Sequence, residues 1–182
     1  MMKQILFVII LLALTGCGGA SKQYLLSVSP TSVSHASKRQ VQIGVDKIIV
    51  PGYLEESQIA VQKGAGEISY RSEIWAVPTA KALTNTLIRS LQKKFSNPSV
   101  YLFPWDVEKE NGIRIKVTIN QFIYSNGTVS LEATYFVKRI GSSHKRSYMF
   151  RTAVGSAADT PSVVQAMDAA FGRLIEEIGR RI

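Results

Sequence analysis

The sequence predicts a two-layer α+β domain in which two amphipathic helices cover one face of a mostly antiparallel sheet. Two segments, 79–95 and 160–182, carry apolar residues at the spacing of a helix that buries one side. Most of the other long segments alternate apolar and polar residues, which is the pattern of half-buried strands. Asn126-Gly127 separates two such strands, and this dipeptide favours a tight antiparallel hairpin because both residues tolerate a positive φ.

The chain starts with an apolar run that is too short to span a membrane. Ile5 to Leu14 are ten apolar residues in a row, whereas a spanning helix needs about 20. A basic start, a short apolar core and a small residue before a cleavage site are typical of a secretory signal peptide. The tetrad 14–17, Leu-Thr-Gly-Cys, resembles the lipobox of bacterial lipoproteins. Residues 1–16 are therefore predicted to be a lipoprotein signal peptide.

The lipobox resemblance implies a covalent lipid on Cys17. By that resemblance the chain is cut before the cysteine, its thiol receives diacylglycerol, and the new amino group is acylated, for example with palmitate. Two or more acyl chains hold a protein stably on a membrane. Lipoproteins kept at the inner membrane often carry Asp after the cysteine, and here Gly18 follows. The resemblance therefore implies the outer membrane, with the domain facing the periplasm.

Cys17 is the single cysteine, so no disulfide can form within the chain. An ordinary secreted protein is the alternative interpretation, but it would leave an unpaired thiol in an oxidising compartment. Residues 17–39 are predicted to be a lipidated flexible tether, because their composition cannot bury enough apolar surface to fold alone. One apolar island, 24–28, is expected to form a short strand that docks on the domain. The domain itself is expected to comprise residues 40–182.

The first half of the domain is predicted as strand, hairpin and helix. Alternation over 41–50 indicates a strand, which Pro51-Gly52 ends. A glycine-rich turn at 64–66 joins two arms of a hairpin, 58–63 and 67–71. In segment 79–95 the apolar residues step by four, and Pro78 suits the start of a helix. The members of that stripe are Leu83, Leu87, Leu91 and Phe95.

The second half is predicted as a short strand, a three-stranded antiparallel meander and a last helix. The short strand is 100–103, and the arms of the meander are 113–124, 129–138 and 147–154. One face of these arms is apolar and the other half-polar, as expected when helices cover a single side. Thr160-Pro161 suits a helix start, and Val163, Met167, Phe171, Leu174 and Ile178 form its stripe.

The charge balance is basic. The net charge is +9, and removal of Lys3 with the signal peptide leaves +8 on the mature side chains. A basic protein suits an acidic partner, such as phospholipid headgroups, lipopolysaccharide phosphates or an acidic protein surface. The periplasmic compartment argues against nucleic acid.

The sequence carries no set of residues that suits catalysis or a metal. His35 and His144 lie in the tether and in a surface turn, away from any cysteine or carboxylate cluster. The Gly-x-Ser-x-Gly pattern of serine hydrolases is absent, and no glycine-rich phosphate loop follows a strand. We therefore expect no enzyme, no catalytic residue, no metal, and no cofactor other than the lipid on Cys17.

An ordered set of short motifs along the mature chain resembles the PqiC/YmbA family, the auxiliary lipoproteins of ABC-type transport systems. The motifs are the lipobox, Tyr24-Leu25-Leu26, Ile49-Val50-Pro51-Gly52-Tyr53-Leu54, Gln58-Ile59, Tyr70-Arg71 and Trp75-Ala76-Val77-Pro78. The family often has an acidic residue where this chain has Val77.

The resemblance implies an outer-membrane lipoprotein that serves as the periplasmic docking subunit of an MCE-type lipid transport system and maintains envelope integrity. The partner would be an MCE-domain protein that spans the periplasm, and ATP hydrolysis would belong to another subunit. Tyr53, Leu54 and Trp75 are the candidate docking residues, with a core position as the alternative for Trp75. Direct phospholipid binding and a homo-oligomer are both compatible with the resemblance.

Two other functions stay open from the sequence. The first is a lipid- or lipopolysaccharide-binding envelope lipoprotein, which the basic charge suits. The second is a structural envelope lipoprotein. A hydrophobic groove between the two helices would favour lipid binding, whereas a self-complementary patch would favour a ring-forming docking subunit.

Overall fold

One long strand organises the sheet. The computed structural model describes residues 21–27, 41–96, 99–104, 112–143 and 146–182. Strand β6 (Gly112–Ser125) pairs antiparallel with β7 (Thr128–Arg139) along its length, and β7 pairs antiparallel with β8 (Arg146–Gly155). Asn126 and Gly127 form the turn with φ of 46° and 79°, as a tight hairpin requires. The predicted three-stranded meander is confirmed.

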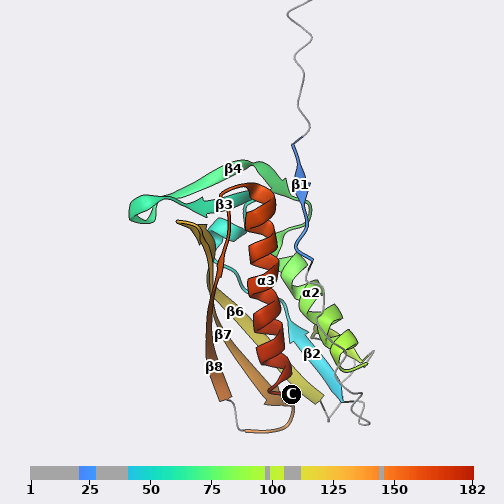
Figure 1. Cartoon of the computed structure of the whole chain (residues 1–182). Coiled ribbons are helices and arrows are strands. Elements are labelled where there is room, and N and C mark those ends of the chain that lie inside the picture. The colour runs from blue at the N-terminus through green and yellow to red at the C-terminus, as the bar shows by residue number, and fades with distance from the viewer. Residues whose placement is uncertain (1–20, 28–40, 97–98, 105–111, 144–145) are drawn as a thin grey trace, which may run out of the picture.

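The other side of β6 receives two shorter strands in parallel. Strand β2 (Gln42–Asp46) pairs with the beginning of β6, and β3 (Gln58–Gln62) pairs with its end. Strand β5 (Val100–Phe103) adds to β2 in parallel, and β4 (Ile68–Trp75) adds to β3 antiparallel. The sheet is open and mixed (Figure 1), and its longest pairings are antiparallel. Strands β2, β3, β5 and β6 therefore run in one direction, and β4 runs opposite to them.

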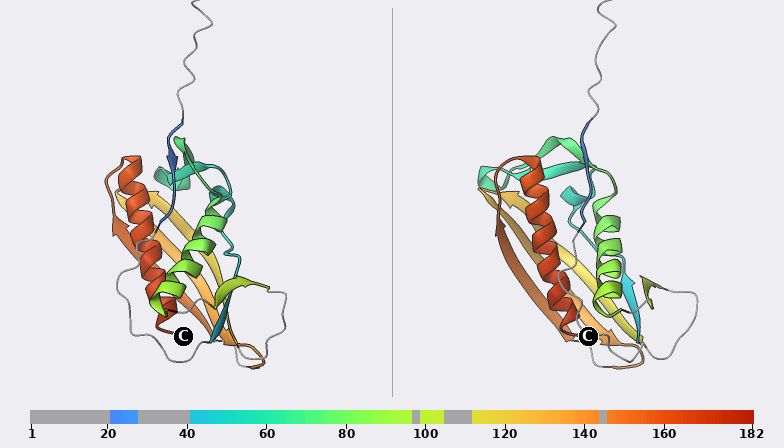
Figure 2. Two further views of the ribbon diagram at one scale, coloured as in Figure 1. Left: turned by 90° about the vertical axis from the view of Figure 1, so that its right-hand side faces the viewer. Right: turned by 45° about the vertical axis from the view of Figure 1, so that its right-hand side comes forward.

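Two helices cover one face of this sheet, as predicted (Figure 2). Helix α3 (Thr160–Gly179) lies over β6, β7 and β8, and α2 (Thr79–Lys94) lies over β2 and β5. Asp159 caps α3 by accepting a hydrogen bond from the Ser162 amide (3.0 Å), and Pro161 lies in the first turn. The α+β class and the one-sided helix layer are confirmed.

The core lies between the helices and the sheet. The predicted stripe of α3 is buried, and so is that of α2 except for Phe95, which follows the helix and is half-buried. Most of the predicted apolar positions of β6 and β7 are buried, whereas those of β8 are at most half-buried. A bulge at Asn120 shifts the register of β6, so that Phe122 returns to the face that the helices cover. Two short 3₁₀ turns, Gly52–Leu54 and Gly64–Gly66, flank β3.

The segment 21–27 packs on the domain, and we call it the N-terminal strap. Its strand β1 (Gln23–Tyr24) pairs in parallel with β4, and the chain then passes down between α2 and α3 (Figure 2). The predicted docking island 24–28 does dock, but its strand starts one residue earlier and ends at Tyr24; Val28 lies outside the described residues. The signal peptide 1–16 and the rest of the predicted tether, 17–20 and 28–39, lie outside the described residues. No helix in the described part of the chain is long and apolar enough to cross a membrane.

Candidate anchoring and docking sites

Backbone hydrogen bonds and one side chain fix the first residues of the strap to β4. The Ser21 hydroxyl donates to the Ser72 carbonyl (2.7 Å). The Ile74 amide donates to the Lys22 carbonyl (3.1 Å), and the Ala76 amide donates to the Tyr24 carbonyl (2.8 Å). The strap thus extends the sheet by one short strand at the edge that β4 forms.

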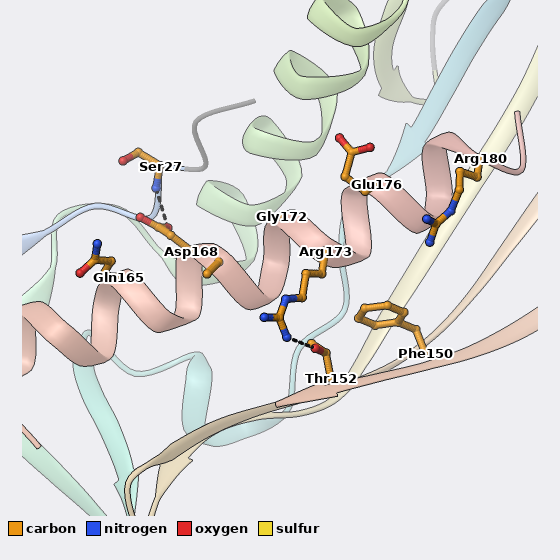
Figure 3. Close-up of a pocket in the computed structure, with 10 residues that line it drawn as sticks. Ser27, Phe150, Thr152, Gln165, Asp168, Gly172, Arg173, Glu176 and Arg180 are labelled. Carbon is orange, nitrogen blue, oxygen red and sulfur yellow. Dashed lines mark hydrogen bonds between the residues drawn. The ribbon is translucent and has the colours of Figure 1, made fainter. Parts of the chain in front are cut away.

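The last residues of the strap are held by both helices. Leu26 is 3% exposed and belongs to the hydrophobic core. The Thr86 hydroxyl of α2 donates to the Leu26 carbonyl (3.5 Å), and the Ser27 amide donates to the Asp168 carboxylate of α3 (2.9 Å; Figure 3). Burying a leucine side chain contributes about 1.5–3 kcal/mol to stability. Leu26 is therefore the main apolar contact that holds the strap on the domain.

Asp168 is half-buried beneath the strap. Burial penalises its charged form and raises its pKa to about 6, while the hydrogen bond from Ser27 acts in the opposite direction. The carboxylate therefore titrates well above the usual range of an aspartate while the strap is docked.

Two grooves lie on either side of the strap. The larger, of about 700 Å³, runs along α3 toward β8 and is lined by residues such as Phe150, Ala169 and Gly172 (Figure 3). Its charged side chains already have partners within the protein. Arg173 donates to the Thr152 hydroxyl (2.9 Å) and to the Ala153 carbonyl (3.0 Å), and Glu176 pairs with Lys94.

The smaller groove, of about 250 Å³, lies on the α2 side and also includes strap residues. Between the two grooves, Leu26 fills the space between the helices. The space between the helices, where a groove would favour lipid binding, is therefore occupied by the chain's own N-terminal segment.

The structure places the predicted docking residues at or near the core. Leu54 is 1% exposed and Trp75 is 5% exposed, so their side chains do not reach the surface. Tyr53 is half-buried, and its hydroxyl accepts a hydrogen bond from the Phe122 amide (2.9 Å). Burial raises the pKa of Tyr53, and this hydrogen bond partly offsets the rise. A docking role for these residues stays a prediction, in which Leu54 and Trp75 would shape the surface rather than touch a partner.

Sequence reasoning gave no role to Arg71, which it used only as part of a family motif, and it missed Asp168; both residues tie segments together. Arg71 of β4 donates to the Thr160 hydroxyl (2.9 Å) and to the Ala158 carbonyl (2.6 Å), which fixes β4 to the start of α3. In the sequence, the only unusual feature of Asp168 is that this carboxylate directly follows Met167 of the apolar stripe. That feature alone did not predict a contact with the strap.

The described part of the chain holds no group of three or more His, Cys, Asp or Glu side chains that suits a metal. Cys17, His35 and His144 lie outside the described residues.

Comparisons with known proteins give a family and a fold. A family model described as ABC-type transport auxiliary lipoprotein component matches residues 24–179. A comparison of the sequence with curated proteins finds no match. A Xanthomonas campestris protein of the DUF330 family has a similar structure, with a TM-score of 0.74 at 17% identity, over 87% of this chain and 93% of that one. The crystal structure of another, uncharacterised protein gives a TM-score of 0.72 at 17% identity, over 88% of this chain and 97% of that one.

Proposed function

Because the chain belongs to the family of ABC-type transport auxiliary lipoproteins, we propose that it is the outer-membrane docking subunit of an MCE-type lipid transport system. In this role Cys17 carries the lipid anchor and the domain faces the periplasm. An MCE-domain protein that spans the periplasm is the partner, phospholipid is the cargo, and the system maintains the integrity of the envelope.

The observation that carries the proposal is the extent of the family match. It begins at Tyr24 within the strap and ends at Gly179, the last residue of α3. The strap is therefore part of the family unit rather than an unrelated leader. The proposed role needs attachment and recognition from this chain, and it assigns no catalytic step, metal or cofactor to it.

A crosslinked pull-down from intact envelopes tests the proposal. Tagged full-length protein is crosslinked in cells that express an MCE-domain protein, purified, and analysed by mass spectrometry. We expect the MCE-domain protein to be enriched over a control that carries the same signal peptide and tag on an unrelated outer-membrane lipoprotein. Equal recovery from both samples would contradict the docking role.

Lipid binding is a second candidate function, and the large groove beside α3 is the observation that favours it. The groove combines Phe150 and Ala169 with charged side chains that could face a headgroup. Native mass spectrometry of the mature domain with phosphatidylglycerol tests it. A stoichiometric adduct that Ala169→Trp abolishes would support this function, whereas the docking role predicts none.

A further inference from the structure

The docked strap leaves little chain between the domain and the expected lipid anchor. Ser21 and Lys22 are hydrogen-bonded to β4, and Cys17 precedes Ser21 by four residues. A fully extended chain covers at most about 3.6 Å per residue, so four residues span at most about 14 Å. A lipid on Cys17 would therefore hold the end of the domain where β1 meets β4 close to the membrane surface.

The length of helix α3 gives the distance from this end of the domain to the opposite end. It starts at Thr160, which is bonded to Arg71 of β4, and its 20 residues span about 30 Å. At its far end Gly179 lies against Lys94, the last residue of α2. Strand β6 begins and β7 ends at this same end of the molecule (Figure 1). We call it the distal end.

Among the described residues, positive charge is concentrated at the distal end. The cations near the ends of the elements that meet there are Lys93, Lys94, Arg114, Lys116, Lys138, Arg139, Arg146, Arg180 and Arg181. The described carboxylates that face them are Asp46, Glu176 and Glu177. In the remainder of the described chain, acidic and basic residues nearly balance.

Ion pairs account for only some of the distal cations. Lys94 pairs with Glu176, and Arg114 pairs with Asp46 through two hydrogen bonds of 2.9 Å. Arg180 and Arg181 both bind Glu177, whose pKa they lower to about 2. The remaining cations form no ion pair with another described residue; they are Lys93, Lys116, Lys138, Arg139 and Arg146. We call these five residues the distal basic cluster.

One cation of the cluster, Lys138, has another cation beside it in the sheet, at a cost in stability. Lys138 lies directly opposite Arg114 in the β6–β7 register. Like charges in directly opposite positions of a sheet repel each other and destabilise the pair. The fold tolerates this repulsion with one carboxylate, Asp46, beside Arg114, and leaves Lys138 and its neighbour Arg139 uncompensated by any described acidic side chain.

We propose that the transport partner docks on the distal end, where the distal basic cluster lies around the ends of β6, β7, β8 and α2, and that the partner presents an acidic protein surface to it. This inference rests on the proposed function and on the anchor at Cys17. The anchoring membrane is an unsuitable occupant, because it lies at the opposite end, about 30 Å away. The charge of its headgroups is screened within about 8 Å at physiological ionic strength. A protein that approaches from the periplasm meets the distal end first.

Charge reversal tests the docking surface. The full-length variant Lys138→Glu/Arg139→Glu/Arg146→Glu is compared with Lys47→Glu/Lys63→Glu/Lys81→Glu, which changes the net charge equally. The control residues are exposed and form no ion pair with another described residue. Both variants are first checked for an unchanged Tm and for fractionation with the outer membrane.

In the crosslinked pull-down, we expect the distal variant to recover at least tenfold less MCE-domain protein than the wild type, and the control variant to recover wild-type amounts. Equal recovery by the distal variant, or equal loss in both variants, would overturn the inference while leaving the proposed function in place. If the wild type recovers no MCE-domain protein, the proposed function fails first and the inference with it. If the mature wild type binds phosphatidylglycerol vesicles and the distal variant does not, the cluster serves a lipid and the inference is also overturned.

Discussion

Leu26 and its neighbour Leu25 show how two adjacent leucines of the strap differ. Leu26 is 3% exposed between the helices, whereas Leu25 is 52% exposed. We expect Leu26→Ala to lower the free energy of unfolding by about 2–3 kcal/mol, from lost burial and the cavity left behind. Leu25→Ala is the matched control and should change it by less than about 0.5 kcal/mol.

Urea unfolding of both variants gives these values, and hydrogen exchange at residues 22–26 reports release of the strap. Equal stability of the two variants would show that the strap does not depend on Leu26 for its position.

Asp168 should make the free energy of unfolding depend on pH, and the direction of that dependence follows from its pKa. The pKa is about 6 in the folded protein and near the usual 3.8 in the unfolded chain, so the folded state binds more protons between these values. The free energy of unfolding therefore receives a contribution that falls as the pH rises from about 4 to about 6. Asp168→Asn should remove this contribution, because the amide does not titrate while its oxygen still accepts from Ser27.

The measurement is urea unfolding of wild type and Asp168→Asn at several pH values between 4 and 7.5. The difference in unfolding free energy between the two proteins should vary with pH across this interval. A constant difference would mean that the carboxylate titrates alike in the folded and unfolded states.

At the scale of secondary-structure elements, the turn between β6 and β7 should be sensitive to substitution of its glycine. Gly127 has a φ of +79°, where an L-residue with a Cβ is strained. We expect Gly127→Ala to cost about 1 kcal/mol of unfolding free energy. Gly155→Ala is the control, since Gly155 pairs with Thr128 of the same hairpin, has no positive φ and has open space around its Cα. Thermal unfolding of the two variants distinguishes them, and an equal loss would show that the turn is not strained by a side chain.

The elements were predictable where their pattern is local. The stripes of the two helices and the alternation of the meander strands identified those elements to within a few residues. The parallel pairing of β2 with β6 was not predictable, because alternation reports which face is buried and not which strand lies alongside. A single turn such as Gly52–Leu54 is too short to show a periodic pattern of apolar residues. The burial of Leu54 could therefore not be predicted from the sequence.

The candidate site was less predictable than the fold. The apolar island around Leu26 indicated that the strap would dock, but its position between α2 and α3 depends on Thr86 and Asp168, which are distant in sequence. The net charge was visible in the composition, whereas its concentration at one end follows from where β6, β7, α2 and α3 begin and end.

For the whole molecule, the expected anchor residue gives the simplest prediction. Cys17→Ala should leave an uncut or unanchored protein that no longer fractionates with the outer membrane, because acylation is what we propose holds it there. The fold itself should be unaffected, so the purified domain should keep the Tm of the wild type. Membrane fractionation with immunoblotting checks the first point. A variant that still sediments normally with the outer membrane would rule out lipidation as its means of attachment.

The parallel pairing of β1 with β4 also determines how the protein would carry a mechanical load. A pull on Cys17 would first reach Ser21 and then the hydrogen bonds of β1, before Leu26 and the Asp168 contact. The force would pass into β4 and the two helices, and the pairing of β2 with β6 would stay outside its path. Movement of the membrane relative to a docked partner would thus be resisted first by the strap.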